Sequence, residues 1–439
     1  MTSASHFPEW SSLSNAERAA AFAQCERRLG KIGRRLNAVE QIFPAQYSNR
    51  GPLWGMPYVA KDMIATGSSA PSWGCSSPQA APLPRASIID RLDQVGATLI
   101  GTATMTELAY EPAGITRRGA LNPWSADAIP GGSSTGSAIL VASGCCFAAL
   151  GSDTGGSVRI PAHCCGVTGL KTTWGAIPSD GSMSLAPSLD TIGFITRSAA
   201  DLALIWQSIF GTSRATNANN AKATVLEDAF AACDGEIAGT CRDAIAILAK
   251  SGVGIEPSSG FPEQADRYAL LVLQAEAARE HRERIEDANI DATVRKRLRK
   301  GLLISDEEIG LALAARDRLR SDFLSRYLGE AGVALLPVLP IRTPHLREVD
   351  PASPLFHPRA LYALSRFTRF VNFLGLPALA VPAGIDSGGL PVGLQIIGAP
   401  GSEAVLLEIG SRLQAFSDWH SRVPRAIAGD ISAEAGLPD

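Results

Sequence analysis

The chain has 439 residues and a formal net charge of −3, from 40 Lys and Arg against 43 Asp and Glu. This near balance argues against a dedicated nucleic-acid-binding protein, which usually carries a strong basic excess. Hydrophobic residues make up 46% and charged residues 19%, so wholesale disorder is excluded and a packed globular fold is expected.

Targeting and redox signals are the next constraint. Residues 1–22 contain no basic segment followed by an apolar core, which argues against a signal peptide. The longest apolar stretch, residues 138–150, is too short to span a membrane. Eight cysteines without CxxC spacing favour buried reduced thiols over disulfides or a zinc site. We therefore expect a cytoplasmic protein.

The first predicted element is a helix over residues 14–41. Ser14 and Glu17 have the spacing of a capping box, in which two side chains satisfy free N–H groups at the start of a helix. Apolar residues then recur every three or four positions. We assign residues 14–49 to an N-terminal helical segment.

Short apolar runs alternate with helical stretches through residues 50–210, a pattern typical of an α/β core built from βαβ units. Residues 211–330 are charge-rich and predict a helical insertion or cap. Their basic run, residues 295–300, is interpreted as a solvated helix face. Apolar runs return within residues 331–425 and predict that the sheet resumes there. The chain is thus expected to form one domain over residues 1–439.

The segment GMPYVAKDM places Lys61 at the end of an apolar strand. Burial disfavours the ammonium form of lysine and lowers its pKa from about 10.4, which makes a neutral amine available as a base. On this segment alone, the favoured interpretation is a lysine whose amine reaches solvent at the strand end.

The segment PGGSSTGSA, residues 130–138, leads into an apolar helical run. Free N–H groups at such a helix start are compatible with a phosphate-binding nest. Residues 132–136 also satisfy G-x-S-x-G, a nucleophile elbow with Ser134 at its centre, which needs a histidine and an acid later in the chain. A third interpretation is a serine positioned within a larger network.

A second glycine-rich segment, residues 151–166, places Ser157 after two glycines. Main chain without side chains can turn its N–H groups toward a point near Ser157 Oγ, as an oxyanion hole requires. Asp153 and Arg159 flank this loop and are suited to a charge-assisted pair. A structural turn is the alternative interpretation.

Lys61, Ser133 and Ser157, in this order and with these flanks, resemble the amidase signature family of serine hydrolases. The resemblance continues through GLKTTWGAIP and SLDTIGFITRSAADLAL, and resumes with NFLGLPALAVPAG and GLPVGLQIIG. It implies an α/β fold with a mixed, mostly parallel central sheet covered by helices on both faces. It also implies that no metal or organic cofactor is required.

The resemblance further implies a Ser-Ser-Lys triad. Ser157 is then the nucleophile, and Ser133, next to a cis peptide bond, bridges it to the base Lys61. Neutral Lys61 takes the proton of Ser133 as Ser133 takes that of Ser157, and the reverse transfer protonates the leaving nitrogen. The implied oxyanion-hole N–H groups are those of Thr154, Gly155, Gly156 and Ser157. The implied supporting residues are Ser134, Asp153 and Arg159.

Two positions depart from the family pattern. The family usually has glycine where Thr135 stands, so a narrower substrate channel is expected. It usually has an aromatic residue where His163 stands, and we interpret His163 as a packed, hydrogen-bonded replacement. Residues 106–111 align with a segment that lines the acyl pocket in relatives, and the 211–330 insertion is expected to shape the entrance.

The sequence does not specify the substrate. Amides that release ammonia or an amine, carbamates (urethanes), hydrazides and carboxybiuret remain open. One alternative is an amidotransferase-type subunit that works with partner subunits. An alternative of another class is a phosphate- or nucleotide-binding protein that uses residues 130–138. The expected partner is a small amide-type substrate, with no nucleic acid and no membrane; a homodimer is one assembly that the sequence leaves open.

Overall fold

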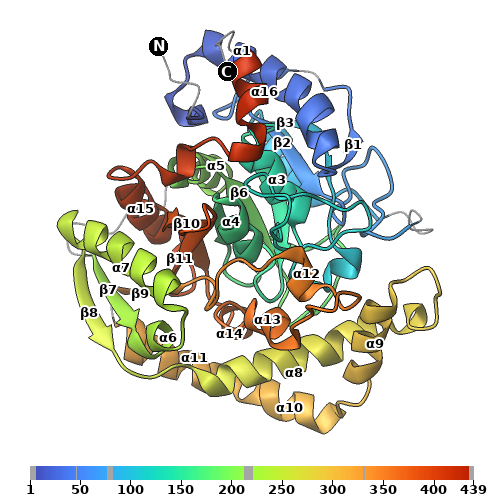
Figure 1. Ribbon diagram of the computed structural model, residues 1–439, viewed down its shortest axis with the longest axis vertical. Coiled ribbons are helices and arrows are strands. Elements are labelled where there is room, and N and C mark those ends of the chain that lie inside the picture. The colour runs from blue at the N-terminus through green and yellow to red at the C-terminus, as the bar shows by residue number, and fades with distance from the viewer. Residues whose placement is uncertain (1–5, 46, 77–82, 212–220, 330–331, 435–439) are drawn as a thin grey trace.

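The computed structural model describes residues 6–45, 47–76, 83–211, 221–329 and 332–434. The strands of these residues are β1 Val39–Ile42, β2 Pro57–Lys61, β3 Thr98–Ala103, β4 Ala148–Asp153, β5 Thr168–Lys171, β6 Thr191–Thr196, β7 Lys222–Leu226, β8 Gly254–Ser258, β9 Gly332–Pro337, β10 Ala378–Ile385 and β11 Pro391–Ile397. They form one eleven-stranded sheet in the order β1-β3-β2-β4-β6-β5-β10-β11-β9-β7-β8 (Figure 1).

The sheet is mixed, as expected, but antiparallel pairs are the majority among the described strands. Parallel pairing joins β2 to β3 and β4, and β7 to β8 and β9. The six other pairings are antiparallel. The expectation of a mostly parallel sheet was therefore wrong. Strands β10 and β11, for example, are joined by a short turn in which the Asp386 N–H donates to the Leu390 carbonyl oxygen at 2.8 Å, whereas a parallel pair needs a long crossover.

The helices are α1 Asn15–Arg28, α2 Ser87–Gln94, α3 Thr135–Ala142, α4 Arg159–Cys165, α5 Ala199–Phe210, α6 Glu227–Ala231, α7 Gly235–Lys250, α8 Glu263–Glu280, α9 Ala292–Gly301, α10 Asp306–Ala314, α11 Arg316–Phe323, α12 Leu346–Val349, α13 Pro358–Ala363, α14 Arg369–Phe373, α15 Glu403–Gln414 and α16 Ala428–Glu434. None of these described helices has the length and apolarity needed to cross a membrane.

Helices cover both faces of the sheet, as expected. Successive side chains of a strand point to opposite faces, and residues paired across antiparallel strands share a face. Leu379 of β10 lies against Gly410 of α15. Its neighbour Ala380 pairs with Gly169 of β5, and Gly169 lies against Ala162 of α4. Helices α15 and α4 therefore pack on opposite faces.

The N-terminal segment begins as predicted and ends differently. The capping box between Ser14 and Glu17 is present at the start of α1. The helical path continues in wider turns through Leu29–Gly33 and then stops at Asn37, which has a φ of 53°. The expected helix over residues 14–41 was therefore too long, because its last residues form β1 and pair with β3.

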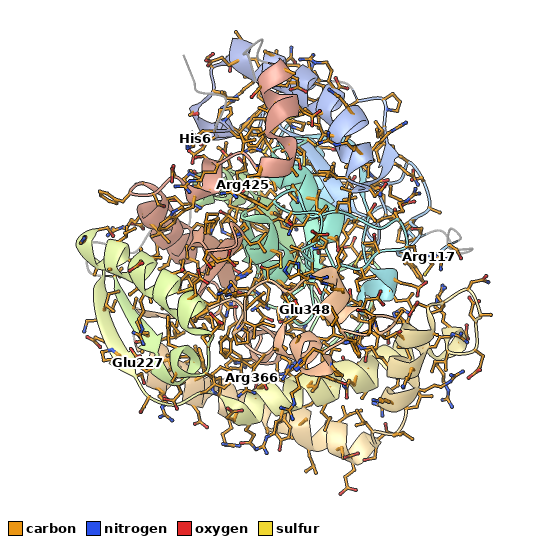
Figure 2. The ribbon with its side chains drawn as sticks, in the orientation of Figure 1. His6, Arg117, Glu227, Glu348, Arg366 and Arg425 are labelled. Carbon is orange, nitrogen blue, oxygen red and sulfur yellow. The ribbon has the colours of Figure 1, made fainter. Side chains whose placement is uncertain are left out.

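The segment over residues 211–330 is helical except for strands β7 and β8, which extend the edge of the sheet. The expectation of a purely helical insertion missed them because Lys222–Leu226 is a short apolar run in a charge-rich setting. Helices α8, α9 and α10 form a layer at the lower side of the molecule (Figure 1). Arg366 joins this layer to the chain before α14 through ion pairs with Glu263 (2.7 Å) and Asp266 (3.3 Å) of α8 (Figure 2).

Candidate active site

Lys61 is the last residue of β2, a strand that is buried along its whole length. Its Nζ lies 2.7 Å from Ser133 Oγ and 2.7 Å from Ser152 Oγ. The expectation that this amine reaches solvent was wrong, because β2 lies between β3 and β4 and ends inside the fold. Burial lowers the pKa of Lys61 to about 7, against the opposing charges of Asp153 and Asp190. A large fraction of this amine is therefore neutral near pH 7 and available as a base.

Ser133 and Ser134 lie in the loop that leads into α3, and every residue from 130 to 138 is buried. The peptide bond between Gly132 and Ser133 is cis, as the resemblance implied. Ser134 Oγ donates to the Ser152 carbonyl oxygen (3.2 Å) and accepts from the Ser152 N–H (3.3 Å). A nucleophile elbow needs an exposed hydroxyl, and a phosphate nest needs access from solvent. The buried loop contradicts both of these interpretations.

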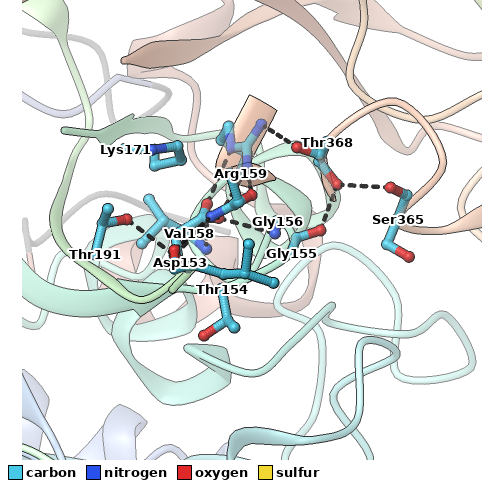
Figure 3. A network of polar contacts seen from close by, with 12 residues as sticks. Asp153, Thr154, Gly155, Gly156, Val158, Arg159, Lys171, Thr191, Ser365 and Thr368 are labelled. Atoms are coloured by element: carbon cyan, nitrogen blue, oxygen red, sulfur yellow. Dashed lines mark hydrogen bonds and ion pairs between the residues drawn. The ribbon is translucent and has the colours of Figure 1, made fainter. Parts of the chain in front are cut away.

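Asp153, at the end of β4, and Arg159, at the start of α4, form a fully buried ion pair. The Arg159 Nη2 donates to Asp153 Oδ1 at 2.8 Å, and its Nε donates to Oδ2 at 3.0 Å. The main-chain N–H groups of Gly156 and Val158 and the Asn372 side chain donate to the same carboxylate (Figure 3). Burial acts to raise the pKa of Asp153, but the charge and hydrogen bonds of Arg159 outweigh it and hold the pKa well below its usual range. The expected pair is present and fixes both ends of the glycine-rich loop.

Ser157 lies on this loop and is 9% exposed, at the wall of a pocket. Its carbonyl oxygen accepts from the Ser134 N–H at 3.1 Å, which joins the two serine-bearing segments. Within the described residues, the Ser157 hydroxyl has no hydrogen-bond partner. The structure therefore brings Lys61 and Ser133 into direct contact, and it leaves the Ser157 hydroxyl free to face the pocket.

The main-chain N–H groups around Ser157 divide into two kinds. The Gly156 N–H donates to Asp153 Oδ1 at 2.8 Å, so the expectation that it serves an oxyanion hole was wrong. The N–H groups of Gly155 and Ser157 donate to no residue of the described chain, and both residues line the pocket. Gly156 has a φ of 126°, and a Cβ there would lie 2.3 Å from a threonine hydroxyl oxygen. Glycine is thus required for the turn that presents the other two N–H groups.

Thr154 also lines the pocket, and its hydroxyl is turned toward the protein. Its Oγ1 donates to Asp190 Oδ1 at 2.6 Å. Burial raises the pKa of Asp190 to about 6, although hydrogen bonds from Thr154, Ser184 and the main chain at Leu185 and Ala186 act to lower it. This contact holds the first residue of the glycine-rich loop.

The pocket around Ser157 has apolar and polar walls from three parts of the chain. The segment predicted to line an acyl pocket contributes Ala109, Tyr110 and Glu111. The 211–330 segment contributes Leu270, Leu273 and Arg297. The remaining lining residues are Pro112, Thr154, Gly155, Ile160, Leu185, Leu361, Tyr362, Ser365 and Arg369.

The two positions that depart from the family pattern lie away from this pocket. Thr135 is fully buried at the start of α3, so the expectation that it narrows a substrate channel was wrong. His163 is buried in α4, and its Nδ1 accepts from the Gly393 N–H at 2.9 Å. Burial lowers the pKa of His163 to about 3, so it is neutral. The interpretation of His163 as a packed, hydrogen-bonded residue is confirmed.

Ser152 is the residue of this site that the sequence did not reveal. It accepts a hydrogen bond from Lys61 Nζ, and its own Oγ donates to Met63 Sδ at 3.1 Å. A neutral amine has two N–H groups and one lone pair. With one N–H directed at Ser152, the lone pair is free to face Ser133. The signal for Ser152 is its place at the end of β4, next to β2 in the sheet, and that pairing is not visible in the sequence.

Fold and site together define an α/β protein with a buried lysine–serine pair behind a glycine-rich serine loop. The chain belongs to the amidase family, whose model, described as "Amidase", matches residues 32–407. This family consists of enzymes that act on carbon–nitrogen bonds.

Several known proteins are similar to this chain. One subunit of the glutamyl-tRNA(Gln) amidotransferase of Moorella thermoacetica is 32% identical, covering 85% of each chain. The protein of the same name from Carboxydothermus hydrogenoformans is 31% identical, over 92% of this chain and 91% of the relative. A solved structure described as "Crystal structure of amidase" has 28% identity and a TM-score of 0.82, over 91% and 96%. The structure of the corresponding amidotransferase subunit from Thermotoga maritima has 25% identity and a TM-score of 0.78, over 95% and 96%.

Proposed function

We propose that the chain hydrolyses a carbon–nitrogen bond of an amide-type small molecule and releases ammonia or an amine. The observation that carries this proposal is the 2.7 Å contact between the buried Lys61 amine and Ser133 Oγ. A neutral base held against a buried hydroxyl has no evident structural purpose, since burying a lysine is unfavourable. Ser157, with a free hydroxyl on the adjacent loop, is the proposed nucleophile.

The reaction proceeds through an acyl-enzyme. Ser157 Oγ attacks the carbonyl carbon, its proton passes to Ser133, and the Ser133 proton passes to Lys61. The N–H groups of Gly155 and Ser157 stabilise the negative oxygen of the tetrahedral intermediate. The return of the proton to the nitrogen lets the carbon–nitrogen bond break. Water then attacks the acyl group through the same relay, releases the acid and restores Ser157.

The test uses the purified chain and a panel of amides, anilides, carbamates and hydrazides. We expect turnover of at least one class and none by Ser157→Ala. A fluorophosphonate should label Ser157, as located by mass spectrometry, and Lys61→Ala should abolish both labelling and turnover. Labelling at another serine, or full activity of Lys61→Ala, would overturn the proposed relay.

A second candidate places the same chemistry in an amidotransferase complex. The observation that favours it is the name shared by the curated relatives, which are 31–32% identical over most of the chain. The purified chain would then be inactive alone and active with partner subunits. Co-purification of a tagged chain from its own cells separates the two candidates, because a free hydrolase is active without companions.

A further inference from the structure

Arg297 differs from its neighbours in the basic run 295–300. It lines the pocket that holds Ser157, whereas Lys296 and Lys300 are exposed. Arg299 is also exposed and pairs with Glu286 at 2.9 Å. The interpretation of this run as a solvated helix face therefore holds for these three residues and fails for Arg297.

Tyr110 holds the Arg297 side chain in place. The Arg297 Nη1 donates to the Tyr110 carbonyl oxygen at 2.7 Å, and the guanidinium carbon lies 5.0 Å from the centre of the Tyr110 ring. Both contacts use one side of the guanidinium group and restrict its position. The Nε and Nη2 donors have no hydrogen-bond partner among the described residues.

The charge of Arg297 is also not cancelled by an ion pair within the described chain. The other arginine of the pocket, Arg369, is paired with Asp266, with N–O distances of 2.7 and 2.8 Å. Glu111 is the acid in the wall next to Arg297, and its carboxylate accepts three main-chain N–H groups at 2.7–3.0 Å, from residues 113–115. Arg297 is therefore the cation of this pocket with free donors.

Arg297 stands at a junction of two cavities. The first contains Ser157 and is lined by the apolar side chains of Ile160, Leu270 and Leu273 among others. The second lies beside it and shares Arg297, Glu111 and Leu361. A substrate whose reacting carbonyl lies at Ser157 would thus pass an apolar wall before it meets the guanidinium group.

We propose that Arg297 determines specificity by binding a carboxylate at the far end of an apolar acyl chain. The substrate class is then the monoamides of dicarboxylic acids, and this inference rests on the function proposed above. A guanidinium group with two free donors suits a carboxylate, which accepts two parallel hydrogen bonds. A terminal methyl group at the same place would leave these donors unpaired and is disfavoured.

The experiment compares matched amides with the purified chain. Succinamate, glutaramate and adipamate are each paired with the neutral alkanamide of equal length, and kcat/KM is measured for both. At least one carboxylate substrate should exceed its neutral partner by about tenfold or more, the effect expected of a charge-assisted contact. Arg297→Gln should remove this preference, and Arg297→Lys should keep part of it. Arg299→Gln, on the same helix but outside the pocket, should leave the preference unchanged.

The outcomes separate this inference from the function on which it rests. Equal or better turnover of the neutral amides by the unmodified chain overturns the role of Arg297, while the hydrolase function stands. The same holds if Arg297→Gln retains the carboxylate preference. If no amide is hydrolysed and Ser157 is not labelled by a fluorophosphonate, both proposals fail. Because the first comparison needs no variant, a folding defect in Arg297→Gln does not prevent the test.

Discussion

The protonation of Lys61 should control the rate of acylation. If Lys61 acts as the base, only its neutral form is active, and its pKa of about 7 sets the acid limb of the pH profile. Well below this pKa, kcat/KM should fall about tenfold for each pH unit. At pH 6 about a tenth of the plateau activity should remain, and above pH 8 the profile should be flat. An amine with the ordinary lysine pKa of about 10.4 would instead lose activity throughout the neutral range.

A second buried lysine provides the control for this assignment. Burial also lowers the pKa of Lys171 to about 7, but its Nζ donates to the Thr172 carbonyl oxygen and not to a serine. We therefore expect Lys171→Met to keep an acid limb, and Lys61→Arg, which stays charged, to be inactive. The assay is the rate of Ser157 labelling by a fluorophosphonate, measured from pH 5 to 9. A rate that is constant down to pH 5, or an acid limb that disappears in Lys171→Met, would refute the assignment.

Three further variants test the surroundings of the site. Ser152→Ala should lower kcat by about tenfold with little change in KM, because one of two hydrogen bonds that orient the base is lost, and Ser152→Thr should recover most of it; steady-state kinetics decide this, and a KM effect alone would contradict it. Asp153→Asn should destabilise the fold by about 3–5 kcal/mol in urea unfolding, because it leaves the Arg159 charge buried without its partner, and an unchanged midpoint would contradict that reasoning. His163→Phe should keep full turnover while losing about 1–3 kcal/mol of stability, since the Gly393 N–H loses its acceptor; a large fall in kcat would mean that His163 takes part in the chemistry.

The sequence predicted the positions of most strands because their apolar runs are short and bounded by glycine and proline. Lys61, for example, was correctly placed at a strand end. Its burial was not predicted, because burial depends on which strands flank β2, and no local pattern records this pairing. Ser152 was missed for the same reason: its contact with Lys61 arises between neighbouring parallel strands.

Direction and engagement of main-chain groups were equally beyond the sequence. The glycine-rich loop indicated free N–H groups, but only the structure separates Gly156, which donates to Asp153, from Gly155 and Ser157, which do not. The basic run around Arg297 read as uniform because charge alone does not say which way a helical side chain points. Its exception became visible only once α9 was placed beside Tyr110.

The walls of the pocket and the proton-transfer groups are built from different parts of the molecule. Lys61 and Ser152 stand at the ends of two central strands, whereas Leu270, Leu273 and Arg297 come from the outer helical layer. Evolution or engineering can therefore exchange residues of α8 and α9 to change which molecule is accepted, without moving the base from its hydroxyl. Such a division leaves one reaction available to many substrates.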